Sequence, residues 1–400
     1  MPWKLKSLKE AKARFILKCK AGLNSFTALC RQSGISRKTG YKWRRRYRTR
    51  GFDGLADRSR RPHRLAKQSA GKWRRRLQHL RRWYPRWGPK KLRCLLVERY
   101  GPKGVPARST LGRWLRAWGW TQPRAQRARR GPVLERPGLS PARRSNAVWT
   151  VDFKGWFRTG DGLRCEPLTV VDLFSRFILG LALLADQSYA PTRAVFVWLF
   201  RRYGLPRCIR VDNGGPFGST GALGLSRLSA WWMRLGIRVE FIRPAHPEEN
   251  AAHERMHREY KAETARPPAP TRRGQQVRTT RFQRRYNCQR PHEALGQRRP
   301  AALYRASARS YPTVLPQWRY PGRDAVRRVR RNGQIKWQGR TRFIGEAFVG
   351  ERIGLKASGP GKHAVYFLGA LIGTLHGDDK GGMRPASCQR HYGPLPKPKL

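Results

Sequence analysis

Three carboxylates occupy positions from which they could act together on one substrate. Asp152 lies in the middle of an apolar run, Asp212 directly follows another such run, and Glu254 lies near the start of an expected helix. An ionised carboxylate in a buried strand is costly unless it is paired or binds a metal. Carboxylate oxygens suit Mg²⁺ or Mn²⁺, and two such ions can support phosphoryl transfer. The residue types therefore predict a site for two divalent cations.

The elements expected around these acids would bring them to one edge of a sheet. Strands are predicted over residues 148–157, 163–173, 176–184, 208–211 and 237–242, and helices over 191–203, about 223–235 and about 250–265. Three strands followed by alternating helices and strands are typical of a mixed α/β sheet flanked by helices. Sites in such sheets lie beyond the carboxyl ends of the strands. Asp212 should lie at such an end, and Glu254 should reach it from its helix.

The composition indicates a polyanionic partner. Lys and Arg number 88 against 23 Asp and Glu, which gives a formal charge of +65. Basic side chains that displace counterions gain affinity for phosphate backbones. No apolar run approaches the roughly 18 residues of a membrane span, and the first residues lack the apolar stretch of a signal peptide. Nucleic acid is therefore favoured over a membrane, and the 12 carboxylates between residues 152 and 263 favour chemistry in that region.

The cysteines indicate a reducing compartment. Seven are scattered along the chain without a Cys-x-x-Cys pair, which argues against both a disulfide framework and a structural zinc site. Cys388 and His391 lie close together in sequence, but no second pair of ligands accompanies them, and we interpret them as solvated tail residues. We expect a cytoplasmic protein that associates with the nucleoid through DNA.

The first residues predict a helix-turn-helix. One helix is expected over residues 25–33, a turn over Gly34 to Ser36 with Ser36 as N-cap, and a second helix over 37–47 with Trp43 turned inward. The outer face of the second helix should enter the major groove of DNA. Its expected DNA contacts are Arg37, Lys38, Lys42, Arg44 and Arg45. The alternative is an ordinary helical hairpin with a solvated basic face.

Four segments carry a more specific signal. They are Trp149-Thr-Val-Asp-Phe-Lys154, the segments 169–177 and 210–217, and Arg243-Pro-Ala-His-Pro-Glu-Glu-Asn-Ala-Ala-His-Glu-Arg-Met-His-Arg258. In this order they resemble the integrase core of bacterial insertion-sequence transposases related to retroviral integrases. The resemblance extends from residues 34–43 to 286–295 and on towards the C-terminus.

This resemblance implies a fold and a reaction. It implies a ribonuclease H-like core and a DDE-type polynucleotidyl transferase, in which Asp152, Asp212 and Glu254 bind Mg²⁺ or Mn²⁺ for DNA cleavage and strand transfer. It also implies DNA partners, namely element ends and target DNA, and a homo-oligomer assembled on them. A decayed copy or a DNA-binding regulator without catalysis is the alternative. A non-catalytic packaging protein would not need the α/β pattern.

The glutamate is the least certain member of the three. In the resembled family it follows a turn from proline to Asn-Gly and begins a helix, which selects Glu254 and leaves 41 residues between it and Asp212. Counting residues as in retroviral integrases would instead select Glu248, and Glu249 is a further alternative. Ala251 stands where the family usually has glycine. If that position requires a positive φ, alanine costs around 1 kcal/mol there and the copy could be inactive.

Other polar residues near these segments receive separate interpretations. Asp172 is expected to be structural. His246, His253 and His257 are expected to contact DNA or solvent. Lys261 is expected either to touch DNA near the reacting phosphate or to be solvated.

The whole chain divides into seven predicted segments. They are a helix-turn-helix module over 1–60, a second helical DNA-binding module over 69–125, a basic linker over 126–145, an integrase-like core over 146–265, a basic helical extension over 266–312, a small β-barrel over 326–376, and a loose tail over 377–400. Residues 51–62 are interpreted as a linker that touches the DNA backbone.

Overall fold

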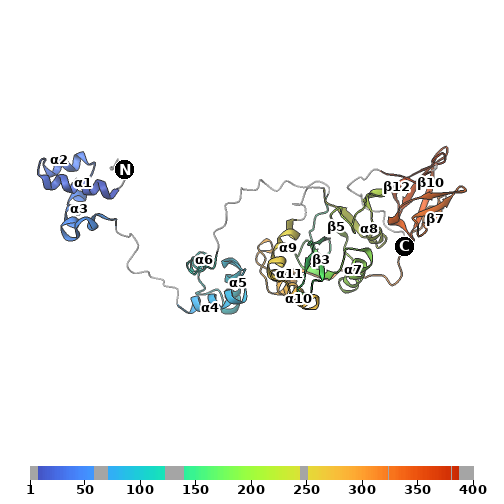
Figure 1. Ribbon diagram of the computed structural model, residues 1–400, viewed down its shortest axis with the longest axis horizontal. Helices are drawn as coiled ribbons and strands as arrows, with labels where there is room; N and C mark the ends of the chain where they lie inside the picture. The colour runs from blue at the N-terminus through green and yellow to red at the C-terminus, as the bar shows by residue number, and fades with distance from the viewer. Residues whose placement is uncertain are drawn as a thin grey trace. The chain divides into compact units, whose positions relative to one another are not determined.

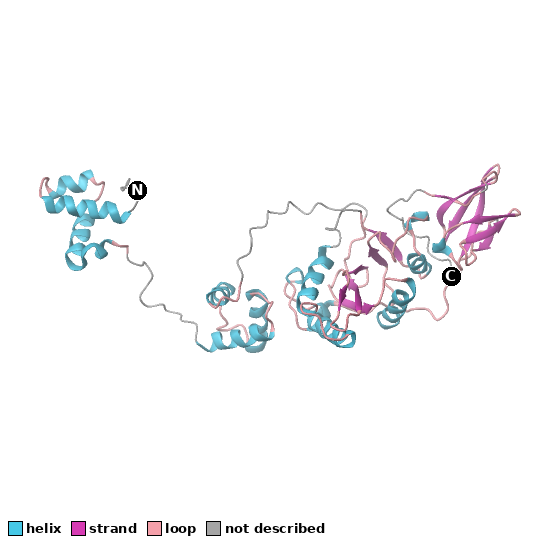
Figure 2. Cartoon of the chain, viewed as in Figure 1, coloured by secondary structure: helices cyan, strands magenta, loops and turns pink. Residues whose placement is uncertain are grey.

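The computed structural model describes residues 8–57, 71–121, 139–243, 251–322, 324–379 and 381–386. The chain divides into two compact units, residues 1–71 and 72–400, which we describe separately (Figure 1). Figure 2 shows helices in both units and strands in the second unit alone. The predictions for His246, Glu248, Glu249, Cys388 and His391 lie outside the described residues. No helix in the described part of the chain combines the length and apolar character needed to cross a membrane.

The first unit is the predicted helix-turn-helix with one additional helix. Its elements are α1 (Leu8–Ala21), α2 (Phe26–Gln32), α3 (Arg37–Arg50) and the 3₁₀ turn η1 (Gly51–Leu55). The Ser36 hydroxyl accepts a hydrogen bond from the backbone N–H of Thr39, which confirms the expected N-cap. Trp43 is buried, so the expected inward face of α3 is also confirmed. Helix α1, which was not predicted, contributes Phe15 and Ile16 to the core of the unit.

The interpretation of residues 51–57 as a linker is wrong. Leu55 is fully buried, and the Lys12 ammonium of α1 donates to the Leu55 carbonyl and to Oδ1 of Asp57 at 3.4 and 2.6 Å. The same ammonium lies 3.9 Å from the centre of the Trp43 ring. A buried lysine is tolerable here because its charge has a carboxylate, a carbonyl and an aromatic face as partners. Residues 51–57 therefore close the first unit.

The second unit begins with the predicted second helical module. It contains α4 (Gly71–Trp83), α5 (Pro89–Tyr100) and α6 (Arg108–Ala117), which lie where helices were expected. Their apolar faces pack together around Leu77, Leu92, Leu96 and Leu111, all fully buried. The apolar spacing of these helices was therefore a sufficient guide to this module.

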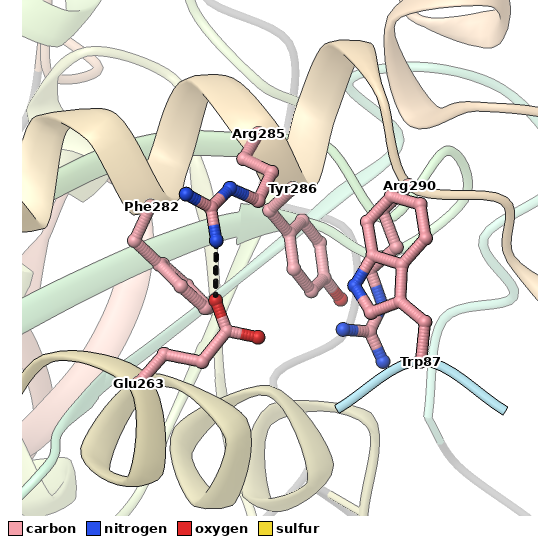
Figure 3. Close-up of a pocket in the computed structure, with 6 residues that line it drawn as sticks. All are labelled: Trp87, Glu263, Phe282, Arg285, Tyr286 and Arg290. Atoms are coloured by element: carbon pink, nitrogen blue, oxygen red, sulfur yellow. Dashed lines mark ion pairs between the residues drawn. The ribbon is translucent and has the colours of Figure 1, made fainter. Parts of the chain in front are cut away.

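This module contacts the helices that follow the sheet. Figure 3 shows Trp87, from the loop between α4 and α5, at a small pocket lined by Phe282, Tyr286 and the Arg285–Glu263 ion pair, whose atoms lie 3.5 Å apart. Trp87 is almost fully buried. At the surface, Lys90 pairs with Glu293 at 2.6 Å. One aromatic anchor with charged pairs around it therefore joins the module to this part of the unit.

A mixed α/β sheet forms the centre of the second unit. Its strands are β1 (Val148–Phe153), β2 (Phe157–Arg158), β3 (Arg164–Asp172), β4 (Ile178–Leu184), β5 (Cys208–Val211) and β6 (Arg238–Phe241). The strand order is β2-β3-β1-β5-β6, with β4 also paired to β3. Strands β1, β3 and β4 pair antiparallel, whereas β1, β5 and β6 pair in parallel. The predicted antiparallel hairpins and the mixed sheet are confirmed.

Helices flank this sheet. They are α7 (Tyr189–Tyr203), α8 (Arg227–Arg234), α9 (Ala251–Thr264), α10 (Arg272–Cys288) and the short α11 (Pro300–Leu303), with 3₁₀ turns η2 (Ala222–Gly224) and η4 (Glu293–Leu295). Helix α7 packs on β4 through Leu199, whose methyl groups would lie 3.1 and 3.2 Å from a Cβ at Gly180, so a larger residue there would require the leucine side chain to shift. Helices α9 and α10 share a buried cluster around Met256, Tyr260 and Phe282.

The C-terminal strands form open sheets, and the predicted closed barrel is not confirmed. Strands β7 (Ala325–Arg328), β10 (Arg352–Gly359), β11 (Lys362–Phe367), β12 (Ala370–His376) and β13 (Arg384–Pro385) make one five-stranded sheet, and β8 (Gln334–Trp337) pairs with β9 (Arg340–Phe343). The 3₁₀ turn η5 (Glu346–Phe348) connects these sheets. Strand β13 pairs with Gly373 and Thr374, so the expectation of a loose tail is wrong for this part of 377–400.

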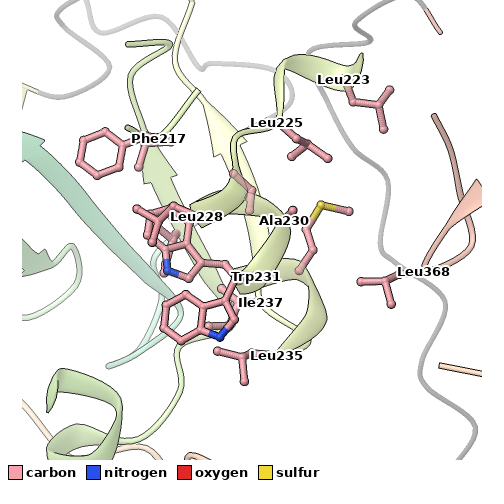
Figure 4. Close-up of a cluster of buried hydrophobic side chains, with 14 of the residues drawn as sticks. Phe217, Leu223, Leu225, Leu228, Ala230, Trp231, Leu235, Ile237 and Leu368 are labelled. Carbon is pink, nitrogen blue, oxygen red and sulfur yellow. The ribbon is translucent and has the colours of Figure 1, made fainter. Parts of the chain in front are cut away.

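Helix α8 joins the α/β sheet to the C-terminal strands. Figure 4 shows Trp231 and Leu228 of α8 with Phe217 on one side and Leu368, from the turn between β11 and β12, on the other. These side chains belong to one continuous buried cluster. Arg234 of the same helix pairs with Glu351 at 3.0 Å. The C-terminal strands therefore share a core with the sheet.

Candidate active site

The sheet places Asp152 and Asp212 at the same level on neighbouring strands. Strands β1 and β5 run parallel, and Thr150 pairs with Arg210 in a register that is constant from Val148 to Thr150. Asp152 and Asp212 each lie two residues beyond this last pair, so both leave the paired region at the same end of the sheet. The first lies near the end of β1 and the second directly follows β5. Asp212 therefore lies at the carboxyl end of a strand, as expected, whereas Asp152, expected in the middle of its strand, lies one residue before the end of β1.

The surroundings of Asp152 raise its pKa. Its side chain is 27% exposed, and burial together with the charge of Asp212 raises the pKa from 3.8 to about 7, with a smaller contribution from Glu254. Lys154 acts in the opposite direction. The contributions of Asp212 and Glu254 mean that all three carboxylates lie within electrostatic range of one another. Their negative charges repel one another at this end of the sheet.

Asp212 is held by the loop that follows it. Its Oδ1 accepts a hydrogen bond from the backbone N–H of Gly214 at 3.3 Å, and burial raises its pKa. A Cβ added at Gly214 would lie 3.4 Å from Oδ2 of Asp212, which is an ordinary van der Waals contact, so the loop passes close to the carboxylate. Asn213 donates to the Ile242 carbonyl at 2.7 Å and thereby ties the loop to the end of β6.

Glu254 lies in the first turn of α9 and is exposed. Among the described residues, no three His, Cys, Asp or Glu side chains are gathered closely enough to form a complete metal site. Asp212 and Glu254 therefore act on the charge of Asp152 without the three acids forming a ready coordination sphere. Ala251 is the first residue of α9, and a helical backbone is a conformation open to alanine.

The expectation that His253 and His257 contact DNA or solvent is wrong. Both are buried, and their Nε2 atoms lie 2.6 and 2.7 Å from the Thr169 hydroxyl. Nδ1 of His253 also lies 2.8 Å from the Thr150 hydroxyl. Burial lowers the pKa of His253 to about 3 and that of His257 well below its usual value, so both imidazoles are neutral at pH 7. Polar partners on β1 and β3 make this burial tolerable.

The two histidines connect α9 to the strand that carries Asp152. The Thr169 hydroxyl donates to the Asp152 carbonyl at 2.9 Å, and Nδ1 of His257 lies 3.5 Å from Oδ2 of Asp152. Because the threonine has one hydroxyl proton, at least one of the imidazoles must donate to its oxygen. Sequence reasoning missed this cluster because its members lie on three separate elements. The spacing of His253 and His257, four residues apart on one helix face, was the signal available.

The structure agrees with the structural interpretation of Asp172. It is fully buried, its Oδ1 accepts from the backbone N–H of Asn146 at 2.7 Å, and its Oδ2 accepts from the backbone N–H of Ser175 at 2.8 Å. The Ser175 hydroxyl donates to the same oxygen at 2.5 Å. These bonds occupy both oxygens within the protein and hold the turn between β3 and β4.

The residues expected to contact DNA occupy solvent-facing positions. The five basic residues of α3 named above are all exposed, and Lys261 of α9 is half-buried. The Lys42 ammonium lies 5.0 Å from the centre of the Trp43 ring, although the residue as a whole is exposed. Free basic heads on one side of α3 are what a helix needs in order to approach phosphates.

Several parts of the chain match models of known protein families. The matches are an integrase core domain over residues 142–247 and again over 235–300, a helix-turn-helix domain over 11–63, a homeodomain-like domain over 39–115, and the C-terminal domain of IS481 family transposases over 324–377. The integrase matches contain all three acids.

Two curated relatives come from bacterial insertion elements. The chain is 29% identical over 189 residues to the insertion element IS407 uncharacterized 31.7 kDa protein of Burkholderia multivorans. It is 30% identical over 188 residues to the insertion element IS476 uncharacterized 39.2 kDa protein of Xanthomonas euvesicatoria. These alignments cover 46% and 47% of this chain and 66% and 52% of the relatives, which is less than two thirds of either relative.

Solved structures of viral integrases are also similar in part. The HTLV-2 integrase catalytic core domain in complex with magnesium is 14% identical with a TM-score of 0.30, covering 41% of this chain and 99% of that one. The catalytic core domain of BIV integrase is 18% identical with a TM-score of 0.31, and the match covers 40% of this chain and 93% of that one. A chain of the simian T-cell lymphotropic virus intasome is 15% identical with a TM-score of 0.34, and the match covers 72% of this chain and 91% of that one. Scores of this size do not by themselves establish a shared fold.

The mixed sheet and the family matches define the class of this protein. It combines helix-turn-helix domains with an integrase core domain. Residues 324–377 match the C-terminal domain of IS481 family transposases and two relatives come from insertion elements, so the chain is similar to insertion-sequence transposases with an integrase core.

Proposed function

We propose that this protein cuts and joins DNA at the ends of an insertion element, with Asp152, Asp212 and Glu254 as its catalytic acids. The observation that carries the proposal is the alignment of the two aspartates on parallel strands, together with the raised pKa of Asp152 caused in part by the other two acids. Buried like charges are unfavourable unless something relieves them, and active sites are where such groupings recur.

The chemistry of the donor set fits divalent cations. All three acids offer oxygen ligands, and a cation would relieve the repulsion that raises the pKa of Asp152. Two Mg²⁺ or Mn²⁺ ions, when bound, would activate the attacking oxygen and stabilise the leaving oxygen. Asp152 and Asp212 would hold them from the sheet and Glu254 from α9.

The protein's own residues would position the acids and exclude water from the side of Asp152 that faces the protein interior. The Thr169 hydroxyl fixes the Asp152 backbone, and His257 lies against the inner side of the Asp152 carboxylate. Asp212 is half-buried, so part of it is accessible to solvent. A DNA phosphate would therefore approach the carboxylates from the solvent side of the strand ends.

DNA would be the partner throughout. The two helical modules would read the element ends, with Arg37, Lys38, Lys42, Arg44 and Arg45 in the major groove, and Lys261 would touch DNA near the reacting phosphate. The C-terminal strands would hold DNA backbone. Two ends must be joined in one reaction, so we propose a homo-oligomer assembled on DNA and associated with the nucleoid.

The test is strand transfer on a labelled element-end duplex with Mg²⁺ or Mn²⁺. We expect Asp152→Asn, Asp212→Asn and Glu254→Gln each to abolish joining while DNA binding persists. Asp186→Asn, which changes an exposed acid outside this group, should retain joining. A parent chain that binds DNA but never cuts it would favour a regulator or a decayed copy. If Glu254→Gln alone remained active, another glutamate would have to replace it in the proposal.

A further inference from the structure

A basic cleft of about 540 Å³ lies at the end of the sheet opposite to the acids. Its wall includes Cys208 and Arg238, the first residues of β5 and β6, whereas Asp212 follows the last residue of β5. A four-residue strand at about 3.3 Å per residue separates the two sites by about 13 Å. The cleft is therefore distinct from the proposed active site.

A buried ion pair holds one wall of the cleft, at Ser140, against the sheet. Arg210 and Glu240, both almost fully buried on neighbouring strands, lie 3.1 Å apart. The backbone N–H of Ser140 donates to the second Glu240 oxygen at 3.0 Å, and Arg210 donates to the Ser140 carbonyl at 2.8 Å. The segment that begins at Ser140 is thus tied to the sheet before any ligand arrives. A site fixed in this way loses little conformational entropy on binding.

The charge at the mouth of the cleft is not neutralised within the described chain. Arg143, Arg144 and Arg207 line the cleft, are exposed, and have no carboxylate within ion-pair distance among the described residues. Arg238 lies 3.6 Å from Glu240, whose charge Arg210 already balances. Several guanidinium groups therefore face one solvent-filled hollow.

The lining identifies the chemistry of the ligand. Among the described residues, those that line it include no aromatic side chain on which a base or nucleoside could stack, and the apolar ones are small. Guanidinium groups instead match phosphate oxygens in pairs of hydrogen bonds. We propose that this cleft binds the phosphodiester backbone of duplex DNA at a place remote from the reacting phosphate. The proposal rests on the proposed function only in taking DNA as the partner.

The test measures binding without chemistry. In an Asp152→Asn background of the full chain, Arg143→Gln, Arg144→Gln and Arg207→Gln are combined. The matched control combines Arg273→Gln, Arg281→Gln and Arg284→Gln, which are exposed on α10 and likewise have no carboxylate partner among the described residues. Both variants lose three charges. Affinity for a duplex of about 40 base pairs, unrelated to any element end, is measured over a range of salt concentrations.

Three phosphate contacts correspond to about 2.7 in the slope of log affinity against log salt. We expect the magnitude of this slope to fall by about 2.7 in the cleft variant and by less than about 1 in the control. DNA should also slow amide hydrogen exchange over residues 139–147 of the parent. Equal losses in both variants, no loss in the cleft variant, or unchanged exchange would overturn the proposal. Strand transfer is not used, so a failure of the proposed catalysis would leave this result standing.

Discussion

Removing the charge of Asp152 should stabilise the metal-free protein. Its pKa in the folded chain is about 7 against an ordinary 3.8, so folding costs the ionised group free energy. A difference of about three units corresponds to at most about 4 kcal/mol. Because the side chain is 27% exposed, solvent screening reduces this to about 2 kcal/mol. Asp152→Asn should therefore raise the melting temperature of the core by about 4–8 °C at pH 8 in EDTA.

The gain should depend on pH. A raised carboxyl pKa means that the folded state holds the proton more tightly, so the parent loses stability as pH rises from about 4 to about 7. Above pH 7 the cost is complete, whereas at pH 5 only about a third of it remains. Asparagine has no such cost at any pH. The difference between variant and parent should thus shrink to about a third at pH 5.

Asp172→Asn is the matched control, since it changes a nearby acid that is fully hydrogen-bonded. The NH₂ group of an asparagine there would face N–H or O–H donors from which the carboxylate now accepts. Each hydrogen bond lost in this way should lower the free energy of unfolding by about 1–3 kcal/mol at both pH values. Melting is followed by circular dichroism. An Asp152→Asn protein that melts at or below the parent temperature at pH 8 would refute the reasoning. Excess Mn²⁺ should stabilise the parent but not Asp152→Asn.

Three further outcomes follow from buried contacts. Trp43→Ala should destabilise the first unit by about 3–5 kcal/mol in denaturant unfolding, whereas exposed Lys38→Ala should change it little, and similar losses would contradict the packing described. Thr169→Val should lower both the melting temperature and strand transfer while Thr169→Ser retains both, and a fully active valine variant would remove the role given to the hydroxyl. Arg210→Met alone should cost about 3–5 kcal/mol, and adding Glu240→Leu should recover most of the loss; an undiminished loss in the double variant would show that the charges are not what matters.

The elements around the acids could be predicted because their apolar residues repeat with the period of their secondary structure. Strand β5 was expected over 208–211 and has those bounds, and its four residues are all buried. The register between strands could not be predicted, since pairing depends on neighbours far away in the sequence. Only the sheet shows that Asp152 and Asp212 lie level with each other.

The missed features have physical causes. Helix α1 was overlooked because its buried face includes Lys12, whose partners lie 43 and 45 residues away. A small β-barrel was predicted over residues 326–376, and strands are present there, but a sequence pattern of short strands does not determine whether their sheet closes. Strand β7 was missed because it is mostly exposed. His253 and His257 were expected to be solvated because polar residues on a basic helix usually face solvent. Here they are buried, and threonine hydroxyl groups on β1 and β3 are their hydrogen-bond partners.

The division of the acids between sheet and helix has a consequence for the spread of such an element. Glu254 is exposed and belongs to α9, so a copy that lost it would keep the buried core of the sheet and both helical modules. Under the proposed function, that copy would still fold and occupy element ends without cutting them. Inactive copies accumulated in a genome would then compete with the active one for its own DNA, and their number would limit further transposition.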